Sequence, residues 1–112
     1  MGDRRATVLH FPEDGYSADI GVYSHWDGYR LEEMVRGVAG SKAFQNRLGD
    51  EAYAARIAID QLTKDARDEE TGYGVFPLVR GGPPLSQFAD ASVETAVHLD
   101  LVTGDVWVGE RV

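Results

Sequence analysis

Apolar and polar positions change spacing several times along the chain, and each spacing predicts one kind of element. Runs of strand-forming residues, alternating or continuously apolar, occur five times. These runs cover 7–11, 20–26, 73–79, 93–102 and 106–109. In the fourth run, Val97 and Leu99 face one way, while His98 and Asp100 face the other.

Two stretches between the second and third runs carry helical spacing. From Leu31 to about Gly40, apolar residues recur at i, i+3, i+4, i+7 and i+8, the pattern of one helix face. That face consists of Leu31, Met34, Val35, Val38 and Ala39. A second helix is predicted from Glu51 to Arg67, and 41–49 permits a helical turn between the two. Its predicted buried stripe consists of Ala52, Ala55, Ile59, Leu62 and Ala66.

The resulting order of elements is β-β-α-α-β-β-β. Hairpins at both ends and helices between them predict an α+β fold, with about five mainly antiparallel strands. The two principal helices are expected to pack on one face of the sheet. A length of 112 residues predicts a single domain, 1–112, and 43% hydrophobic residues suffice for a modest core.

Composition excludes several classes of function. The net charge of −8 argues against nucleic-acid binding, which requires a basic surface. No cysteine is present, and no apolar run approaches the ~18 residues of a membrane span. The first residues lead into a strand and not into a signal-peptide core, so a cytoplasmic location is expected. Neither GxxxxGK[ST] nor GxGxxG occurs, and no cofactor is expected.

Candidate chemistry is densest in residues 23–30, where the second strand ends and the first helix begins. Asp27-Gly28 breaks the strand, since glycine tolerates positive φ and aspartate bonds to its own backbone. A helix start leaves backbone amides unpaired, so anion binding is expected near Arg30. The structural alternative places Trp26 in the core, Asp27 in the turn and His25 at a partly exposed position.

This stretch also resembles a known sequence signature. Residues 23–29, Tyr-Ser-His-Trp-Asp-Gly-Tyr, resemble the Tyr-x-His-Trp-Asp-Gly-Tyr motif of small uncharacterised proteins from bacteriophages and actinobacteria. Arg30 stands where those proteins usually have proline, and Gly72-Tyr73-Gly74-Val75 is a weaker similarity. The family has no settled activity. The resemblance therefore implies a phage context, with the host cytoplasm as the location and a host signalling nucleotide or defence protein as the target.

Two catalytic interpretations use the histidines. His25-x-Asp27 and His98-x-Asp100 each place a histidine and a carboxylate on one strand face, and four metal-type ligands would converge if the strands were neighbours. Alternatively, Asp27 would orient His25 to activate water in a small hydrolase. Ser24 is excluded as a triad nucleophile with His25, because adjacent strand residues point to opposite faces.

Ligand binding without turnover is the interpretation we favour over catalysis. Aromatic rings supply stacking surfaces for a planar base, and arginine pairs with phosphate. The predicted ligand-binding residues are His25, Trp26, Asp27, Tyr29, Arg30 and Tyr73. The expected partner is a nucleotide-like small molecule or a host protein. The apolar run Val106-Trp107-Val108 predicts an exposed sheet edge and hence a homo-oligomer.

Overall fold

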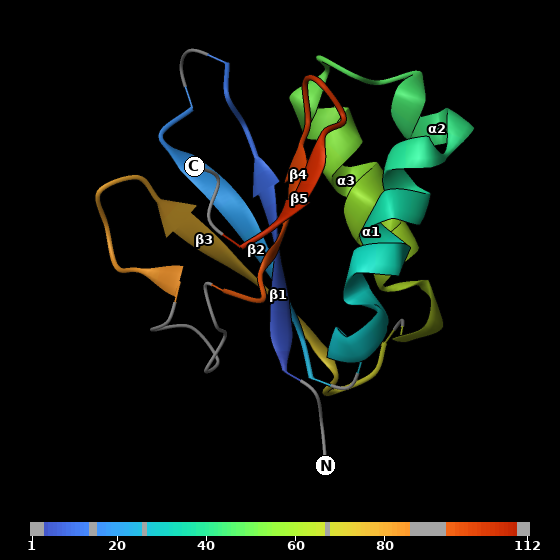
Figure 1. Cartoon of the computed structure of the whole chain (residues 1–112), viewed down its shortest axis with the longest axis vertical. Coiled ribbons are helices and arrows are strands. Elements are labelled where there is room, and N and C mark those ends of the chain that lie inside the picture. Colours follow the sequence, from blue (N-terminus) through green and yellow to red (C-terminus); the bar gives the residue numbers. More distant parts are fainter. Residues whose placement is uncertain (1–3, 14–15, 26, 67, 86–93, 110–112) are drawn as a thin grey trace.

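Five strands form one sheet in the order β3-β2-β1-β4-β5 (Figure 1). The computed structural model describes residues 4–13, 16–25, 27–66, 68–85 and 94–109. The strands are β1 Arg5–His10, β2 Ala18–Ser24, β3 Tyr73–Val79, β4 Val97–Asp100 and β5 Val106–Val108. All neighbours are antiparallel except β1 and β4, which run parallel. The expected α+β class and the mainly antiparallel sheet are confirmed.

The helices lie together on one face of the sheet (Figure 1). They are α1 Leu31–Gly40, the short α2 Lys42–Gln45 and α3 Glu51–Leu62, with 3₁₀ turns η1 Gly28–Arg30 and η2 Lys64–Ala66. The predicted face of α1 is confirmed, because Leu31, Val35, Val38 and Ala39 are buried and Met34 packs against the core. This face meets Leu9 of the central strand in one continuous hydrophobic cluster.

The second principal helix differs from its prediction in both length and orientation. It ends at Leu62, after which the chain tightens into the 3₁₀ turn η2, where the Ala66 amide donates to the Thr63 carbonyl at 2.9 Å. Its buried residues are Glu51, Ala54, Ala55, Ala58 and Leu62. Small alanine side chains let a helix approach its neighbours closely, and three of the alanines face inward. The predicted Ala52 is instead exposed, and Ile59 is only partly buried. Arg67, the predicted end, lies outside the described residues.

The fourth strand is also shorter than predicted. The Asp100 carboxylate accepts the amides of Val102 and Thr103, at 2.8 and 3.0 Å, and this local turn ends β4. The predicted alternation is confirmed, since Val97 and Leu99 join the core while His98 lies outside it. Residue 93, the predicted start, is not among the described residues.

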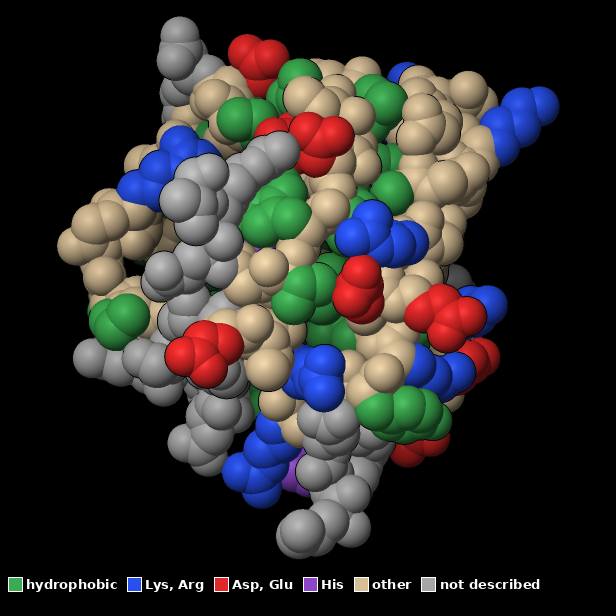
Figure 2. Space-filling view, viewed as in Figure 1, with side chains coloured by type: hydrophobic (Ala, Val, Ile, Leu, Met, Phe, Trp, Pro, Cys, Tyr) green, Lys and Arg blue, Asp and Glu red, His purple; other side chains and the backbone are tan. Residues whose placement is uncertain are grey.

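The outer part of the sheet is less covered by helices. β3 is an edge strand and lies farthest from them (Figure 1). As a result, Val75 is 58% exposed and Val79 50% exposed. On the face shown in Figure 2, basic and acidic side chains are interspersed over the helical layer. Among the described residues, no helix has the length and apolar composition required to cross a bilayer.

Candidate functional site

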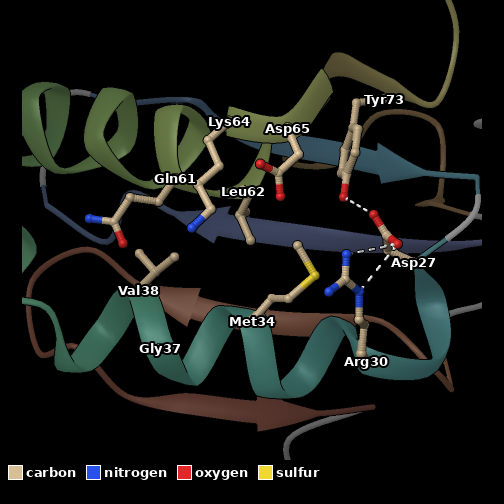
Figure 3. Close-up of a pocket in the computed structure, with 10 residues that line it drawn as sticks. All are labelled: Asp27, Arg30, Met34, Gly37, Val38, Gln61, Leu62, Lys64, Asp65 and Tyr73. Atoms are coloured by element: carbon tan, nitrogen blue, oxygen red, sulfur yellow. Dashed lines mark hydrogen bonds and ion pairs between the residues drawn. The ribbon is translucent and has the colours of Figure 1, made fainter. Parts of the chain in front are cut away.

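A groove of about 490 Å³ lies between α1 and the end of α3, close to the first residue of β3 (Figure 3). Small-molecule sites in proteins have volumes of a few hundred to a thousand Å³, so the groove has a suitable size. Its walls come from three parts of the chain that are distant in sequence. The lining residues are Asp27, Arg30, Met34, Gly37, Val38, Gln61, Leu62, Lys64, Asp65 and Tyr73.

One end of the groove is formed by a cluster of Asp27, Arg30 and Tyr73 (Figure 3). The Tyr73 hydroxyl donates to Asp27 Oδ2. Arg30 donates to Asp27 Oδ1 from Nε at 3.3 Å and contacts it with Nη2 at 3.2 Å. The cluster forms because Tyr73 pairs with Ser24 in the β2–β3 register, and the Ser24 hydroxyl accepts the Asp27 amide at 3.2 Å.

The cluster fixes the charge state of its own members. Burial of Tyr73, together with its hydrogen bond to Asp27 and the charge of Asp27, raises the pKa of Tyr73 to about 12. The negative charge of Asp27 also raises the pKa of Arg30. At neutral pH, Tyr73 is therefore a neutral donor and Arg30 a permanent cation. Neither side chain can accept a proton from a substrate at that pH.

The rest of the groove combines an apolar floor with two charged side chains. Val38 and Leu62 are buried and Met34 is half-buried, whereas Gly37 contributes no side chain, which leaves the groove open at its position. Lys64 directs its ammonium group into the space between the helices (Figure 3). Within the ranges the structure describes, Lys64 makes no ion pair. Asp65 lines the same space.

His25 belongs to a different surface from the groove. Its Nδ1 lies 2.7 Å from the Tyr23 hydroxyl, and its amide donates to the Gly72 carbonyl at 2.9 Å. Tyr23 and His25 line a separate hollow with 71–74. Asp27 contacts Tyr73 and Arg30, and Nδ1 of His25 contacts Tyr23, so both members of the pair in the hydrolase interpretation have other partners.

The remaining predicted ligand-binding positions are dispersed. Tyr29 is 72% exposed and lines a shallow hollow on the outer side of α1. Trp26 lies outside the described residues. The amides of Arg30 and Leu31 already donate to the carbonyls of Asp27 and Gly28, because a 3₁₀ turn precedes α1. The expected anion site on free amides is therefore absent at these two residues.

The two His-x-Asp pairs do not converge. Ser24, next to His25, pairs with Arg5 at the start of β1, while Asp100 pairs with His10 at its end. The length of β1 therefore separates the pairs. Asp100 is also occupied by the turn after β4. No group of three or more potential metal ligands occurs among the described residues.

A second polar cluster, which the sequence did not predict, lies on the sheet face opposite the helices. His10 Nε2 lies 2.7 Å from His98 Nδ1, and both rings stack with Trp107 at centroid distances of about 5 Å. Asp19 Oδ2 lies 3.3 Å from His10 Nδ1, and Asp19 Oδ1 lies 2.9 Å from Arg80 Nη2. The sequence contained one indication of this cluster: both histidines lie on strands, with their side chains on the side away from the core.

Burial shapes the protonation of this cluster. Burial, followed by the electrostatic interaction with His10, lowers the pKa of His98 to about 4, although Gly109 and Asp19 act in the opposite direction. Burial alone would raise the pKa of Asp19, but hydrogen bonds from His10, the Phe11 amide and Arg80 lower it to about 2. His98 is therefore neutral and Asp19 ionised at pH 7.

Comparison of the chain with protein-family models, with curated proteins and with solved structures finds no match in any of the three.

Proposed function

We propose that the protein binds a nucleotide-like small molecule in the groove between α1 and α3, without turnover. The observation that carries the proposal is the pairing of an apolar floor with two cations, Arg30 and Lys64, in one groove of suitable size. A planar base would pack on Met34, Val38 and Leu62. A phosphate would bind at the cations.

Arg30 retains the capacity to bind a ligand although it is paired with Asp27. The guanidinium has five N–H donors, and Asp27 engages only Nε and Nη2. Nη1 therefore stays available for a phosphate oxygen, and Asp27 holds the group in place before the ligand arrives. Such preorganisation lowers the entropic cost of binding. Lys64 adds a second cation that has no competing acid partner within the described ranges.

Binding is favoured over catalysis by the state of the polar groups in the groove. Tyr73 keeps its proton to about pH 12 and Arg30 is permanently charged. Asp27 already accepts from both, so it is poorly placed to remove a proton from a substrate. Beside the acceptors Asp65 and Gln61, the groove thus offers donors and apolar surface, which are the features of a recognition site.

The proposal also includes a biological setting. The resemblance of 23–29 to the phage and actinobacterial motif supports sequestration of a host signalling nucleotide as a counter-defence. A cytoplasmic location fits this role. The cytoplasmic location is also compatible with the absence of cysteine, and hence of disulfides, from the sequence.

The test is a thermal-shift and calorimetric screen against mono-, di- and cyclic nucleotides. We expect Arg30→Ala to weaken binding by about ten- to hundredfold, because a charge-assisted hydrogen bond is lost. Arg36→Ala is the matched control, since Arg36 pairs with Glu32 on the exposed side of α1, outside the groove. Failure of every nucleotide to raise the wild-type midpoint would overturn the proposal, and a search for a host protein partner would replace it.

A second pair of variants tests the location of the site. Gly37 and Gly40 both lie on α1, and a Cβ at either position would meet no atom within 4 Å. Only Gly37 lines the groove. We therefore expect Gly37→Leu to abolish nucleotide binding and Gly40→Leu to leave it unchanged. Equal affinity in the two variants would place the binding site elsewhere.

A further inference from the structure

The end of the groove opposite Asp27 is formed by Gln61, whose side-chain amide is held in one orientation. Gln61 Nε2 donates to the Ser41 hydroxyl oxygen at 3.0 Å. Ser41 donates its hydroxyl proton to the Val38 carbonyl at 2.7 Å and accepts the Phe44 amide at 3.4 Å. A carbonyl can only accept and a backbone amide can only donate, so the roles of Ser41 in these two contacts are fixed.

The arrangement around Ser41 determines which end of the Gln61 amide faces the groove. A hydroxyl has one proton and two lone pairs, and the three contacts of Ser41 use all of them. If the Gln61 amide were reversed, its oxygen would face the Ser41 oxygen with no proton between them. Nε2 is therefore directed to Ser41, and Oε1 points toward Val38 across the groove (Figure 3).

Oε1 is an acceptor at the end of the groove away from Arg30 (Figure 3). The run from Arg30 to Val38 covers about 12 Å along the helix axis. In the described part of the chain, Oε1 accepts no hydrogen bond from the protein. A ligand whose phosphate lies at Arg30 would therefore bring the far edge of its base toward an unused acceptor.

From this geometry we propose that the groove selects nucleobases with an amino group on that edge, as in adenine. The proposal rests on the nucleotide-binding function argued above and adds the identity of the base edge. An exocyclic amine donates to Gln61 Oε1, whereas a base with only a C–H at that position leaves the acceptor unpaired. Ser41 acts as a positioning residue, because it prevents the amide from turning its own donor toward the ligand.

The test compares two ligands that differ only at this position. Adenosine 5′-monophosphate carries the amine, and purine riboside 5′-monophosphate carries hydrogen in its place. By calorimetry, we expect wild-type protein to bind the first about three- to tenfold more tightly, the effect of one neutral hydrogen bond. Gln61→Met keeps the side-chain length but lacks the acceptor. It is expected to remove this preference, so that the ratio of the two affinities falls to about one.

Ser41→Ala supplies a second and independent variant. It leaves Gln61 in place but frees its amide to turn, so the preference for the amine is expected to shrink while purine riboside monophosphate still binds. Equal wild-type affinities for the two ligands would overturn the base-edge inference and leave the binding function standing. Binding of neither ligand would also overturn the base-edge inference, whereas the binding function falls only if every nucleotide of the wider screen fails to bind.

Discussion

Tyr73 donates its hydroxyl to the carboxylate of Asp27 across 46 residues of sequence. Tyr73 is the first residue of β3, and Asp27 follows the end of β2, so the hydrogen bond links the two strand ends at the rim of the groove. The same carboxylate holds Arg30. The rim of the proposed site is therefore assembled by strand pairing and not by the local turn alone.

Tyr73→Phe is expected to lower the free energy of unfolding by about 1–3 kcal/mol, because a half-buried carboxylate loses a donor. Urea denaturation at pH 7 measures this change. Tyr29→Phe is the control, since that phenol is 72% exposed, and its effect is expected to be within about 0.5 kcal/mol. Equal effects of the two substitutions would show that the Tyr73–Asp27 contact does not stabilise the fold.

Gly21→Ala is expected to destabilise the protein through steric overlap. A Cβ at position 21 would lie 2.2 Å from the ring of Phe76, which covers this glycine from the neighbouring strand. Overpacking of this kind costs about 1–3 kcal/mol. Thermal denaturation is the measurement, and Gly74→Ala is the control, because no atom lies within 4 Å of its Cβ position.

The double variant Gly21→Ala/Phe76→Leu completes a double-mutant cycle that tests this steric overlap. A smaller side chain at 76 removes the overlap, so the second substitution is expected to cost less in the Gly21→Ala background than in wild type. If the two changes in the free energy of unfolding were strictly additive, steric overlap with Phe76 would not be the cause of the destabilisation.

His98 is expected to make stability depend on pH. Its pKa is about 4 in the folded protein and near 6.5 in the unfolded chain, so the unfolded chain binds more protons between these values. Stability is then fully present above pH 6.5 and falls as the pH drops through 4. With partial solvent exposure taken into account, the loss is about 1–2 kcal/mol.

His98→Asn checks the origin of this pH dependence. Urea titrations from pH 7.5 to 4 should show a shallower slope for the variant than for wild type. His25→Asn serves as the control, because it leaves the His10–His98 cluster intact and should keep the wild-type slope. If the stability of the His98→Asn variant and of wild type fell in parallel, the pH dependence would belong to other groups.

Asp19, with a pKa of about 2, contributes a further loss of stability only below about pH 3.8.

Homo-oligomerisation stays a prediction. The predicted edge is present, because β5 is an edge strand and Val108 is 40% exposed, but the opposite edge exposes more apolar surface. Trp107 stacks on His98, so the C-terminal edge presents less aromatic surface than the sequence implied. The apolar edge is β3, where Val75 and Val79 are half exposed or more. We expect light scattering at high concentration to show a dimer, and Val79→Lys to give a monomer. Val108→Lys on the other edge is the control. A wild-type monomer at every concentration would refute the prediction.

The sequence by itself determined the elements whose signals are local. The face of α1 followed from its apolar spacing, and the alternation of Val97, His98 and Leu99 followed from strand geometry. The end of the second strand before Asp27-Gly28 was also predicted correctly, although Gly28 does not have a positive φ and the Asp27 side chain caps no backbone amide. Each of these features depends on residues that are close in sequence, so the local sequence is sufficient to predict it.

Tertiary structure decided the rest, because the partners come from distant parts of the chain. Which side of α3 is buried depended on how closely alanines could approach neighbouring elements, and spacing alone favoured a stripe through Ile59. The contact of His10 with His98 spans 88 residues and exists only because β4 pairs beside β1 in one register. Gln61 and Lys64 line the groove for the same reason, because packing of α3 against α1 places them across from Gly37 and Val38 (Figure 3), and no local pattern in the sequence specifies that packing.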